Sequence, residues 1–457
     1  MENFKTLITM VRVVKIALIL PLFFGCGPSY LDVRPDKQMR VPNTVADCMA
    51  LLNDYATMNT RYPSIGEAAS DNHYLPDARF NAQDVFEREN YCWLPQANHR
   101  VAEWYYPYRV VFNANMVLEV LKGRASTETD YDLAKGTALF FRAYAFFHLA
   151  QVFAAPYTYG QTENYPGVPL RLDPAVSTPS ERSSLADTYG RVIDDLTLAA
   201  SVLPETVPVK TLPSKAAAYA MLARVYLTIQ DYEHALQFAN QALRLQNDLL
   251  DFSLLNTSSN VPIPRFNAEV VFHSLLQSNP IFATANCLVD SNLVREYEEG
   301  DLRKKVFFRE NANGTHTFKG SYDGTFTNIV FNGLTTSELY LISAECDARL
   351  GNVDRAMANL KTLIASRWDN SKPLPRYLLE DDGDMLRIVI NERRKELVLR
   401  GQRWTDLRRL NMNSAFASVL KRNVEGIQYE LPPNDLRYTL LIPDDVMNRT
   451  NMMQNPR

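Results

Sequence analysis

One segment, 214–246, constrains the fold of this chain more than any other: SKAAAYAMLARVYLTIQDYEHALQFANQALRLQ. Its second half places Ala235, Ala239 and Ala242 on one helical face. Small side chains at this spacing allow two antiparallel helices to approach closely, and the large side chains of the first half fill the space between them. The segment therefore predicts a packed helix pair, with Ser214 as the N-cap of its first helix.

A weaker copy of this pattern lies at 335–367, and both copies have the spacing typical of tetratricopeptide repeats. The copies are far apart in the sequence, so they do not predict a simple repeat array. Periodicity also predicts amphipathic helices at 137–154 and 185–203. Glycine is scarce, with 17 among 457 residues, and this favours helix because glycine weakens helices. We therefore expect a mainly α fold.

The predicted organisation is a scaffold of tetratricopeptide-type helix pairs with long irregular loops and a few short strands. The expected scaffold segments are about 40–58, 109–154, 183–246, 335–367 and 384–410. Short strands are expected at 268–274 and 437–442. The loops at 59–108 and 279–334 are expected to face a ligand, because loops of this length in a compact domain are usually functional.

The N-terminus has the features of a secretory signal. Residues 1–25 carry three basic side chains and one acid, followed by a short apolar run, IALILPLFFG, that ends at Cys26. The run is too short to span a membrane as a helix. Gly25 directly before Cys26 is similar to a bacterial lipoprotein processing site, which would place a lipid on Cys26. We expect a lipoprotein signal peptide over 1–25 and a single domain over 26–457. The alternative is an ordinary signal peptide with an incidental cysteine.

Few patterns in the chain indicate catalysis or cofactor binding. The sequence has no H-E-x-x-H, G-x-S-x-G, P-loop or G-x-G-x-x-G motif, and no zinc-ligand spacing of Cys and His. We therefore expect no enzyme, no metal and no cofactor. The formal charge of −4 argues against a nucleic-acid partner. Secretion would permit disulfides, but we expect buried free thiols at the four remaining cysteines, Cys48, Cys92, Cys287 and Cys346.

The segment 71–108 is the strongest candidate for ligand binding. Aromatic side chains alternate there with amides, acids and Arg, which suits a sugar with its apolar faces and hydroxyl rim, or a peptide. We expect Trp93 to be an exposed stacking platform, because it lies in a loop rather than on a helical stripe. Trp104 and Tyr108 are instead expected to pack at a helix start. The predicted site also includes Asp71, Asn72, Tyr74, Asn98 and Arg100.

The stretch 388–410, IVINERRKELVLRGQRWTDLRRL, resembles the pattern E-R-R-x-E-L…G-x-R-W-x-D-L-R-R of the SusD/RagB family of bacterial outer-membrane lipoproteins. Within the stretch, Glu392, Glu396 and Arg400 are one helical turn apart, so ion pairs along the helix are expected. Arg400 departs from the family, which usually has Glu there. Further family-like segments occur in the family's order: YLDVRPDK at 30–37, SDN at 70–72, WYYPYRVVFNANMVL at 104–118, FFRAYAFFHLAQVFAAPY at 140–157 and SSLADTYGRVIDDL at 183–196.

The resemblance covers essentially all of 26–457 and implies a nutrient-binding lipoprotein. Such a protein would be lipid-anchored in the outer membrane, face the cell exterior and capture a glycan or peptide without cleaving it. Its partner would be a SusC-like TonB-dependent outer-membrane barrel that receives the ligand. The alternative is a tetratricopeptide-type scaffold that faces the periplasm and assembles other proteins. Starch, host glycan, plant polymer and peptide all remain open as ligands.

Overall fold

The computed structural model describes residues 42–158, 160–175, 179–379 and 384–457. Pro42–Arg457 forms one compact unit in which helices prevail and strands are few and short, so the predicted mainly α fold is confirmed. The expected signal peptide over 1–25 and the expected lipid site at Cys26 lie outside the described residues.

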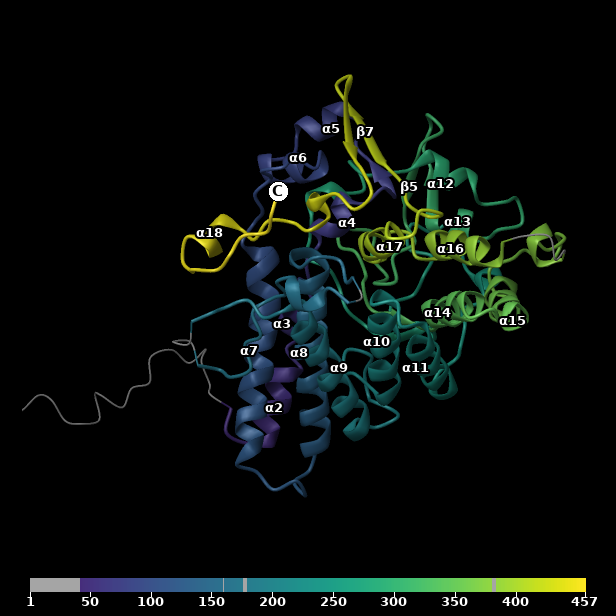
Figure 1. Ribbon diagram of the computed structural model, residues 1–457. Coiled ribbons are helices and arrows are strands. Elements are labelled where there is room, and N and C mark those ends of the chain that lie inside the picture. The colour runs from purple at the N-terminus through teal and green to yellow at the C-terminus, as the bar shows by residue number, and fades with distance from the viewer. Residues whose placement is uncertain (1–41, 159, 176–178, 380–383) are drawn as a thin grey trace, which may run out of the picture. The chain divides into compact units, whose positions relative to one another are not determined.

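The scaffold is a continuous stack of antiparallel helices (Figure 1). In the order of packing, each helix contacts the next: α7, α8, α9, α10, α11, α14 and α15. α8 is buried along almost its whole length, because apolar or small side chains occur on every side of the helix. The scaffold helices are α2 (Val45–Leu52), α3 (Tyr55–Met58), α7 (Ala102–Lys122), α8 (Tyr131–Phe153), α9 (Leu185–Val202), α10 (Lys215–Thr228), α11 (Tyr232–Leu245), α14 (Thr336–Arg349) and α15 (Val353–Ala365).

The two tetratricopeptide-like pairs, far apart in the sequence, are neighbours in space. α11 packs directly against α14, so the pair α10–α11 continues into the pair α14–α15. Ala235, Ala239 and Ala242 are fully buried on α11, and Ser214 caps α10 as predicted, with its hydroxyl accepting from the Ala217 amide. The chain between the pairs, 246–335, is thus an insertion into one stack of helices.

The segment 59–108 was predicted to be an irregular loop, and this prediction is wrong because the segment contains several helices and a short strand. Asp84 caps a short helix by accepting from two amides, and α7 begins at Ala102 rather than near 109, with Pro107 inside it. Pro107 is buried and lacks only one amide bond, which the long helix tolerates. The elements of this segment are α4 (Ile65–Ala69), β1 (His73–Tyr74), α5 (Asp77–Asn81) and α6 (Val85–Tyr91).

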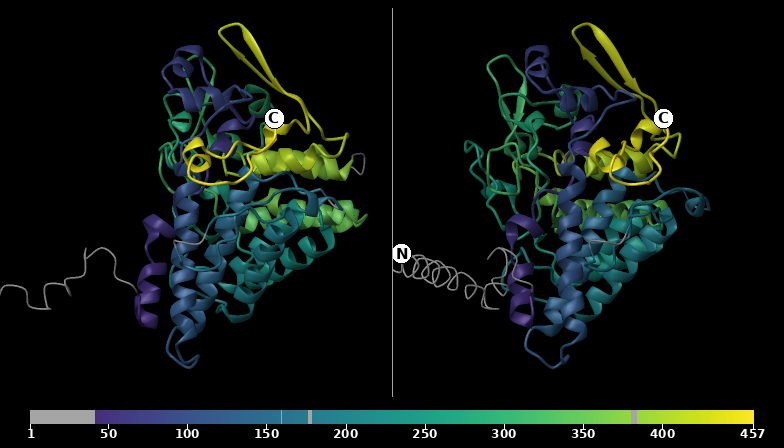
Figure 2. Two further views of the ribbon diagram at one scale, coloured as in Figure 1. Left: turned by 60° about the vertical axis from the view of Figure 1, so that its left-hand side comes forward. Right: turned by 90° about the vertical axis from the view of Figure 1, so that its left-hand side faces the viewer.

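The strands form four separate two-stranded antiparallel pairs. The strand predicted at 268–274 is confirmed by β2, whereas 437–442 begins in a 3₁₀ turn, so that strand prediction is wrong. A hairpin that the sequence did not indicate turns at Glu425 and Gly426, both with positive φ, and projects at the top of both views in Figure 2. The pairs are β1 with β3 (Leu288–Val289), β2 (Val270–Phe272) with β6 (Leu334–Thr335), β4 (Phe308–Glu310) with β5 (His316–Phe318) and β7 (Leu420–Val424) with β8 (Ile427–Leu431).

The family-like stretch 388–410 forms two helices joined by a tight turn. Asp384 caps the first by accepting from the Arg387 amide, and Gly401 in the turn has a left-handed φ of 69°. All four described cysteines are buried and free, which confirms that prediction. The remaining helices are α12 (Ser291–Arg295), α13 (Arg303–Phe307), α16 (Met385–Glu396), α17 (Arg403–Leu410) and α18 (Asp444–Met447), with 3₁₀ turns at Thr162–Asn164, Phe252–Leu254, Pro280–Phe282, Arg376–Leu378 and Leu436–Tyr438.

Both acids of α16 pair with distant arginines, and Glu392 also pairs along the helix, with Lys395 at 2.6 Å. Glu392 binds Arg303 at 2.5 Å, and Glu396 binds Arg367 at 2.8 Å, whereas Arg400 lies over the ring of Tyr322. Both pairs are almost fully buried. The stretch is therefore structural, because it joins the insertion to the end of the scaffold.

Candidate ligand-binding site

Trp93 is not the exposed platform that the sequence suggested. Its side chain is only 4 % exposed, and its indole N–H donates to the Ala69 carbonyl at 2.9 Å. The Arg422 guanidinium lies 4.6 Å from the ring centroid. Trp93 has a positive φ of 53°, and this turn directs its side chain inward. The expectation of exposure failed because a loop position with no helical stripe can still be buried by a distant segment.

Asp71 and Asn72 are held by arginines of α16 and α17. Both carboxylate oxygens of Asp71 accept from Arg403, at 2.6 and 2.9 Å, and Arg394 donates to the Asn72 carboxamide at 3.2 Å. Burial alone would raise the pKa of Asp71, but the charges of Arg403 and Arg394 outweigh it and hold that pKa well below its usual range. These two residues join the N-terminal segment to the family-like helices.

The six predicted residues do not form one site. Asp71, Tyr74 and Trp93 line one cavity, which we call the arginine cavity. Asn98 accepts from the Asp444 amide, and Arg100 binds the carboxylates of α6 and its cap, so neither is part of that cavity. Asn72 is buried behind it. The predicted polar groups are thus largely engaged within the protein.

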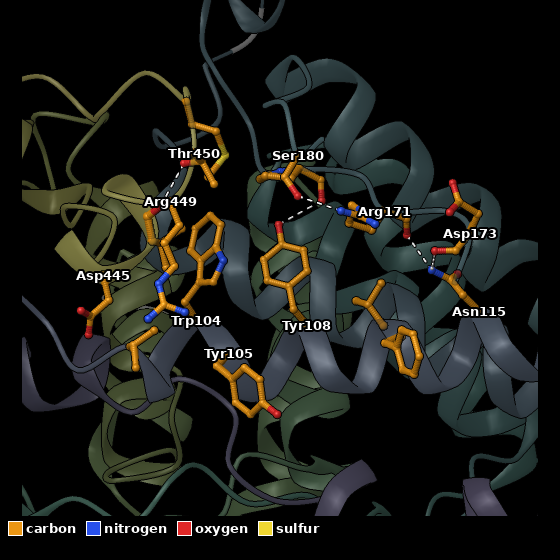
Figure 3. A pocket seen from close by; sticks show the side chains of 16 residues that line it. Trp104, Tyr105, Tyr108, Asn115, Arg171, Asp173, Ser180, Asp445, Arg449 and Thr450 are labelled. Carbon is orange, nitrogen blue, oxygen red and sulfur yellow. Dashed lines mark hydrogen bonds between the residues drawn. The ribbon is translucent and has the colours of Figure 1, made fainter. Parts of the chain in front are cut away.

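A second cavity of about 530 Å³ lies along the N-terminal half of α7, and we call it the aromatic groove (Figure 3). Trp104, Tyr105 and Tyr108 of α7 form its floor, with Trp104 and Tyr108 one helical turn apart on the same face and Tyr105 pointing in a different direction. Its rims come from the segment 169–173 with Ser180, and from the C-terminal segment around α18. Its lining residues are Val101, Trp104, Tyr105, Tyr108, Val111, Phe112, Asn115, Pro169, Arg171, Asp173, Ser180, Asp445, Val446, Arg449, Thr450 and Met452.

Two of the three floor rings are held by contacts within the protein, and the third is exposed to solvent. Trp104 and Tyr108 have ring centroids 5.0 Å apart, and Trp104 also packs edge-on against Phe153 of α8. The Tyr108 hydroxyl donates to the Pro169 carbonyl at 2.9 Å, and burial raises the pKa of Tyr108 well above its usual value. Tyr105 is 53 % exposed. The groove therefore offers one free aromatic ring beside two that the core holds in place.

One rim of the groove is fixed by hydrogen bonds, and the other carries free charge. The Asn115 carboxamide donates to the carbonyls of Arg171 and Asp173, at 2.9 and 3.3 Å, which ties the segment 169–173 to α7. On the opposite rim, Asp445 and Arg449 are exposed and make no ion pair with any described residue. A carboxylate and a guanidinium are thus available beside the aromatic floor.

The groove continues beyond the C-terminal segment into a neighbouring hollow of about 710 Å³. The two share Ser180, Arg449, Thr450 and Met452. The second hollow adds Tyr165, which is 39 % exposed. The two hollows thus adjoin at these four residues, and each contains an aromatic ring.

The sequence did not predict the aromatic groove, although two of its floor residues, Trp104 and Tyr108, were considered there. Trp104 and Tyr108 were assigned to packing, and both do pack, but each also turns one face to the groove. The signal that could have found the floor is the run Trp104-Tyr105-Tyr106 at a helix start, which places neighbouring rings on both the buried and the open side. No sequence signal connects α7 to Asp445 and Arg449, which are more than 300 positions away.

No helix among the described residues combines the length and the apolar character needed to cross a membrane. The described part of the chain also contains no group of three or more Cys, His, Asp or Glu side chains arranged to hold a metal ion.

Comparison with known proteins assigns the family. Two family models match: one described as "Starch-binding associating with outer membrane" over residues 29–227, and the SusD family over 302–456. SusD-like protein P2 of Formosa agariphila is 23 % identical over 422 residues, covering 78 % of this chain and 79 % of that protein. A putative sugar binding protein from Bacteroides vulgatus has a similar fold, with a TM-score of 0.75, 21 % identity and coverage of 92 % and 99 %.

A laminarin binding SusD-like protein shares the fold as well, with a TM-score of 0.66, 18 % identity and coverage of 90 % and 98 %. The first family model includes α7 and the rim residues of the segment 169–173, and the second includes α18. The chain belongs to the SusD/RagB family.

Proposed function

We propose that this protein captures a glycan chain in the aromatic groove. The observation that carries the proposal is the pairing of an exposed ring, Tyr105, with the free Asp445 and Arg449 on the rim. A sugar ring stacks its C–H face on an aromatic face, while its hydroxyls need charged or amide partners. The starch-binding description of the family model and the laminarin-binding relative support a glucan as the first ligand to test.

The two adjoining hollows favour an oligosaccharide over a single sugar. Tyr105 and Tyr165 lie in two hollows that share four lining residues, so one chain can contact both rings. Each added sugar contributes contacts without a new loss of translational freedom, so affinity rises with chain length until both hollows are filled.

The test is calorimetric titration with maltohexaose and laminarihexaose, and with their mono- and disaccharides. We expect Tyr105→Ala to weaken hexaose binding about thirtyfold, because losing a central aromatic anchor costs about 2 kcal/mol. The melting temperature should change little, since Tyr105 is half exposed.

Phe266→Ala is the matched control, because Phe266 is also an exposed aromatic (41 %) but does not line the groove. Loss of binding with Phe266→Ala and not with Tyr105→Ala would move the site to that surface. Failure of every glucan to bind, together with binding of a peptide library, would replace glycan by peptide.

We further propose that the protein is anchored by a lipid on Cys26, faces the cell exterior and passes its glycan to a SusC-like TonB-dependent barrel. Family membership and the lipoprotein-like sequence at Gly25-Cys26 support this proposal. One acyl chain gives only marginal membrane binding, so at least two are required.

Cys26→Ser should release the protein from outer membranes or stall its processing, and mild detergent extraction of the wild type should bring down the barrel. A Cys26→Ser protein that is processed normally and stays membrane-bound would contradict the anchor. Extraction with periplasmic proteins and no barrel would favour the interaction-scaffold alternative.

A further inference from the structure

The arginine cavity has a different chemistry from the aromatic groove. It has a volume of about 760 Å³ and lies between β1, α16, α17 and the β7–β8 hairpin. Seven charged side chains line it, five of them cationic: Asp71, Asp290, Arg387, Arg394, Arg403, Lys421 and Arg422. An excess of positive charge within one hollow attracts an anion, and the low-dielectric walls strengthen that attraction.

Asp71 and Asp290, the two acids of the cavity, do not accept from every N–H group of the arginines beside them. Asp71 accepts from Nε and Nη2 of Arg403, and Asp290 lies 3.5 Å from Nη2 of Arg394. No described residue accepts from Nη1 of either arginine, and neither Nη1 is sealed from solvent. Each guanidinium therefore presents an unused N–H group at the cavity.

Arg422 is a buried cation without a carboxylate partner among the described residues. It donates to the carbonyls of Ala68, Ser70 and Tyr91, and its Cζ lies 3.6 Å from the centroid of the Tyr91 ring. Burial lowers the pKa of Arg422, because the charged form lacks water. Its Nε has no described acceptor and keeps contact with solvent. A buried guanidinium supported only by carbonyls and rings is electrostatically under-compensated.

The mouth of the cavity carries two more cations on exposed side chains. Arg387 is 54 % exposed, lies over the ring of Phe416 at 5.4 Å and is 3.7 Å from Asp384. Lys421 is 60 % exposed and pairs with Glu430 outside the cavity. Phe416 adds an apolar face beside these charges. This combination of fork-shaped donors and one ring face suits a sugar that bears an oxyanion.

We propose that the arginine cavity is a second saccharide site that binds the carboxylate of a uronic acid. The free guanidinium N–H groups of Arg394, Arg403 and Arg422 contact the carboxylate, and Phe416 contacts the sugar ring. This site is separate from the aromatic groove, and the proposal does not depend on the glucan site being correct.

The test is titration of the intact protein with trigalacturonate, and with neutral galactotriose as the uncharged probe. We expect trigalacturonate alone to bind, with affinity that falls as NaCl rises from 20 to 300 mM, because salt screens exposed charge. The double variant Arg387→Gln/Lys421→Gln should weaken binding about fivefold, since two mouth charges are lost and the buried arginines remain. Arg422→Lys should weaken it further, because lysine keeps the charge and loses the fork.

Tyr105→Ala is the control and should leave trigalacturonate binding unchanged, while the double variant should leave hexaose binding unchanged. A thermal melt of each variant shows whether it folds, and the double variant, which alters only exposed side chains, carries the test if Arg422→Lys does not fold. Equal binding of the charged and neutral trisaccharides, or loss of trigalacturonate binding with Tyr105→Ala alone, would overturn the proposal.

Discussion

The helix stack and the arginine-rich junction around α16 and α17 each have a fully buried core, but the two cores are held together by different forces. In the stack, Leu222 and Ala223 of α10 and Ala235, Ala239 and Ala242 of α11 have no exposed surface, and the two helices pack together. At the junction, Arg303, Arg367 and Glu396 have no exposed side-chain area and lie in one ion-pair network with Glu392. Burial of apolar area is non-directional, whereas each buried ion must meet its partner in one geometry.

This difference shows how the chain fixes its insertion. The stack can form from local helix pairs, but the insertion 246–335 has little regular structure of its own. Its Glu269, Asp301 and Arg303 reach the network with Arg367 and α16. A misplaced insertion would leave these charges buried and unpaired, so the network selects one arrangement of segments that apolar packing alone would not distinguish.

The largest expected effect comes from removing the centre of the network. Arg303→Met removes the cation that Asp301, Glu392 and Glu396 share and leaves these three buried carboxylates with only Arg367 and Lys395. The free energy of unfolding should therefore fall by about 3–5 kcal/mol at pH 7. Lys304→Met, an exposed change on the same helix, should be nearly neutral. Urea unfolding of both variants measures the effect, and equal stabilities would show that the network is dispensable.

The stability of the Arg303→Met variant should also depend on pH differently from that of the wild type. Burial alone would raise the pKa of Glu392, but Arg303 and Lys395 lower it to about 2, so its stabilising contribution is full above about pH 4.5 and is lost as the pH falls toward 2. In Arg303→Met the carboxyls prefer to be protonated. The gap in stability between wild type and variant should therefore narrow between pH 7 and pH 4.

A smaller effect is expected in the stack. Leu222 is fully buried on α10, and Leu222→Ala should cost about 2–4 kcal/mol through lost burial and a cavity. Leu198→Ala, on the partly exposed face of α9, should cost under about 0.5 kcal/mol. Repeating the urea titrations at pH 4 and pH 7 should give the same loss for Leu222→Ala, because no charge is involved. A loss that varied with pH would break the contrast between the two regions.

The smallest effect concerns Glu67 of α4, a buried acid that makes no ion pair with a described residue. Burial raises the pKa of Glu67 from about 4.5 in the unfolded chain to about 8 in the folded protein. Between these two pH values the folded protein keeps a proton on Glu67 that the unfolded chain loses, so stability declines as the pH rises from about 4.5 to 8. Glu67→Gln removes this decline, so the variant should be more stable than the wild type at pH 8, with little change at pH 4. Thermal melts across this range measure the difference, and a variant less stable than wild type at pH 8 would show that the Glu67 carboxylate is paired.

Tyr105→Ala and the variants of the arginine cavity extend the comparison from stability to binding. Tyr105, Arg387 and Lys421 are exposed and outside both cores, so changes there should alter affinity and leave the melting temperature nearly unchanged.

The sequence by itself determined the main scaffold helices and some of their caps. The alanine spacing of 214–246, the cap at Asp384 and the left-handed Gly401 were all predictable, because helical periodicity and capping depend on neighbours within a few positions. The family resemblance was also readable, since its motifs are contiguous.

Only the tertiary structure decided where the ligand surfaces lie. Trp93 was predicted to be exposed, but Arg422, more than 300 positions later, covers it; Tyr105 is left open on the same segment. Likewise, the two tetratricopeptide-like pairs are far apart in the sequence and are neighbours only in the folded structure, where α11 packs against α14. The physical reason is that exposure is set by long-range contacts, and sequence periodicity reports only which side of an element is apolar.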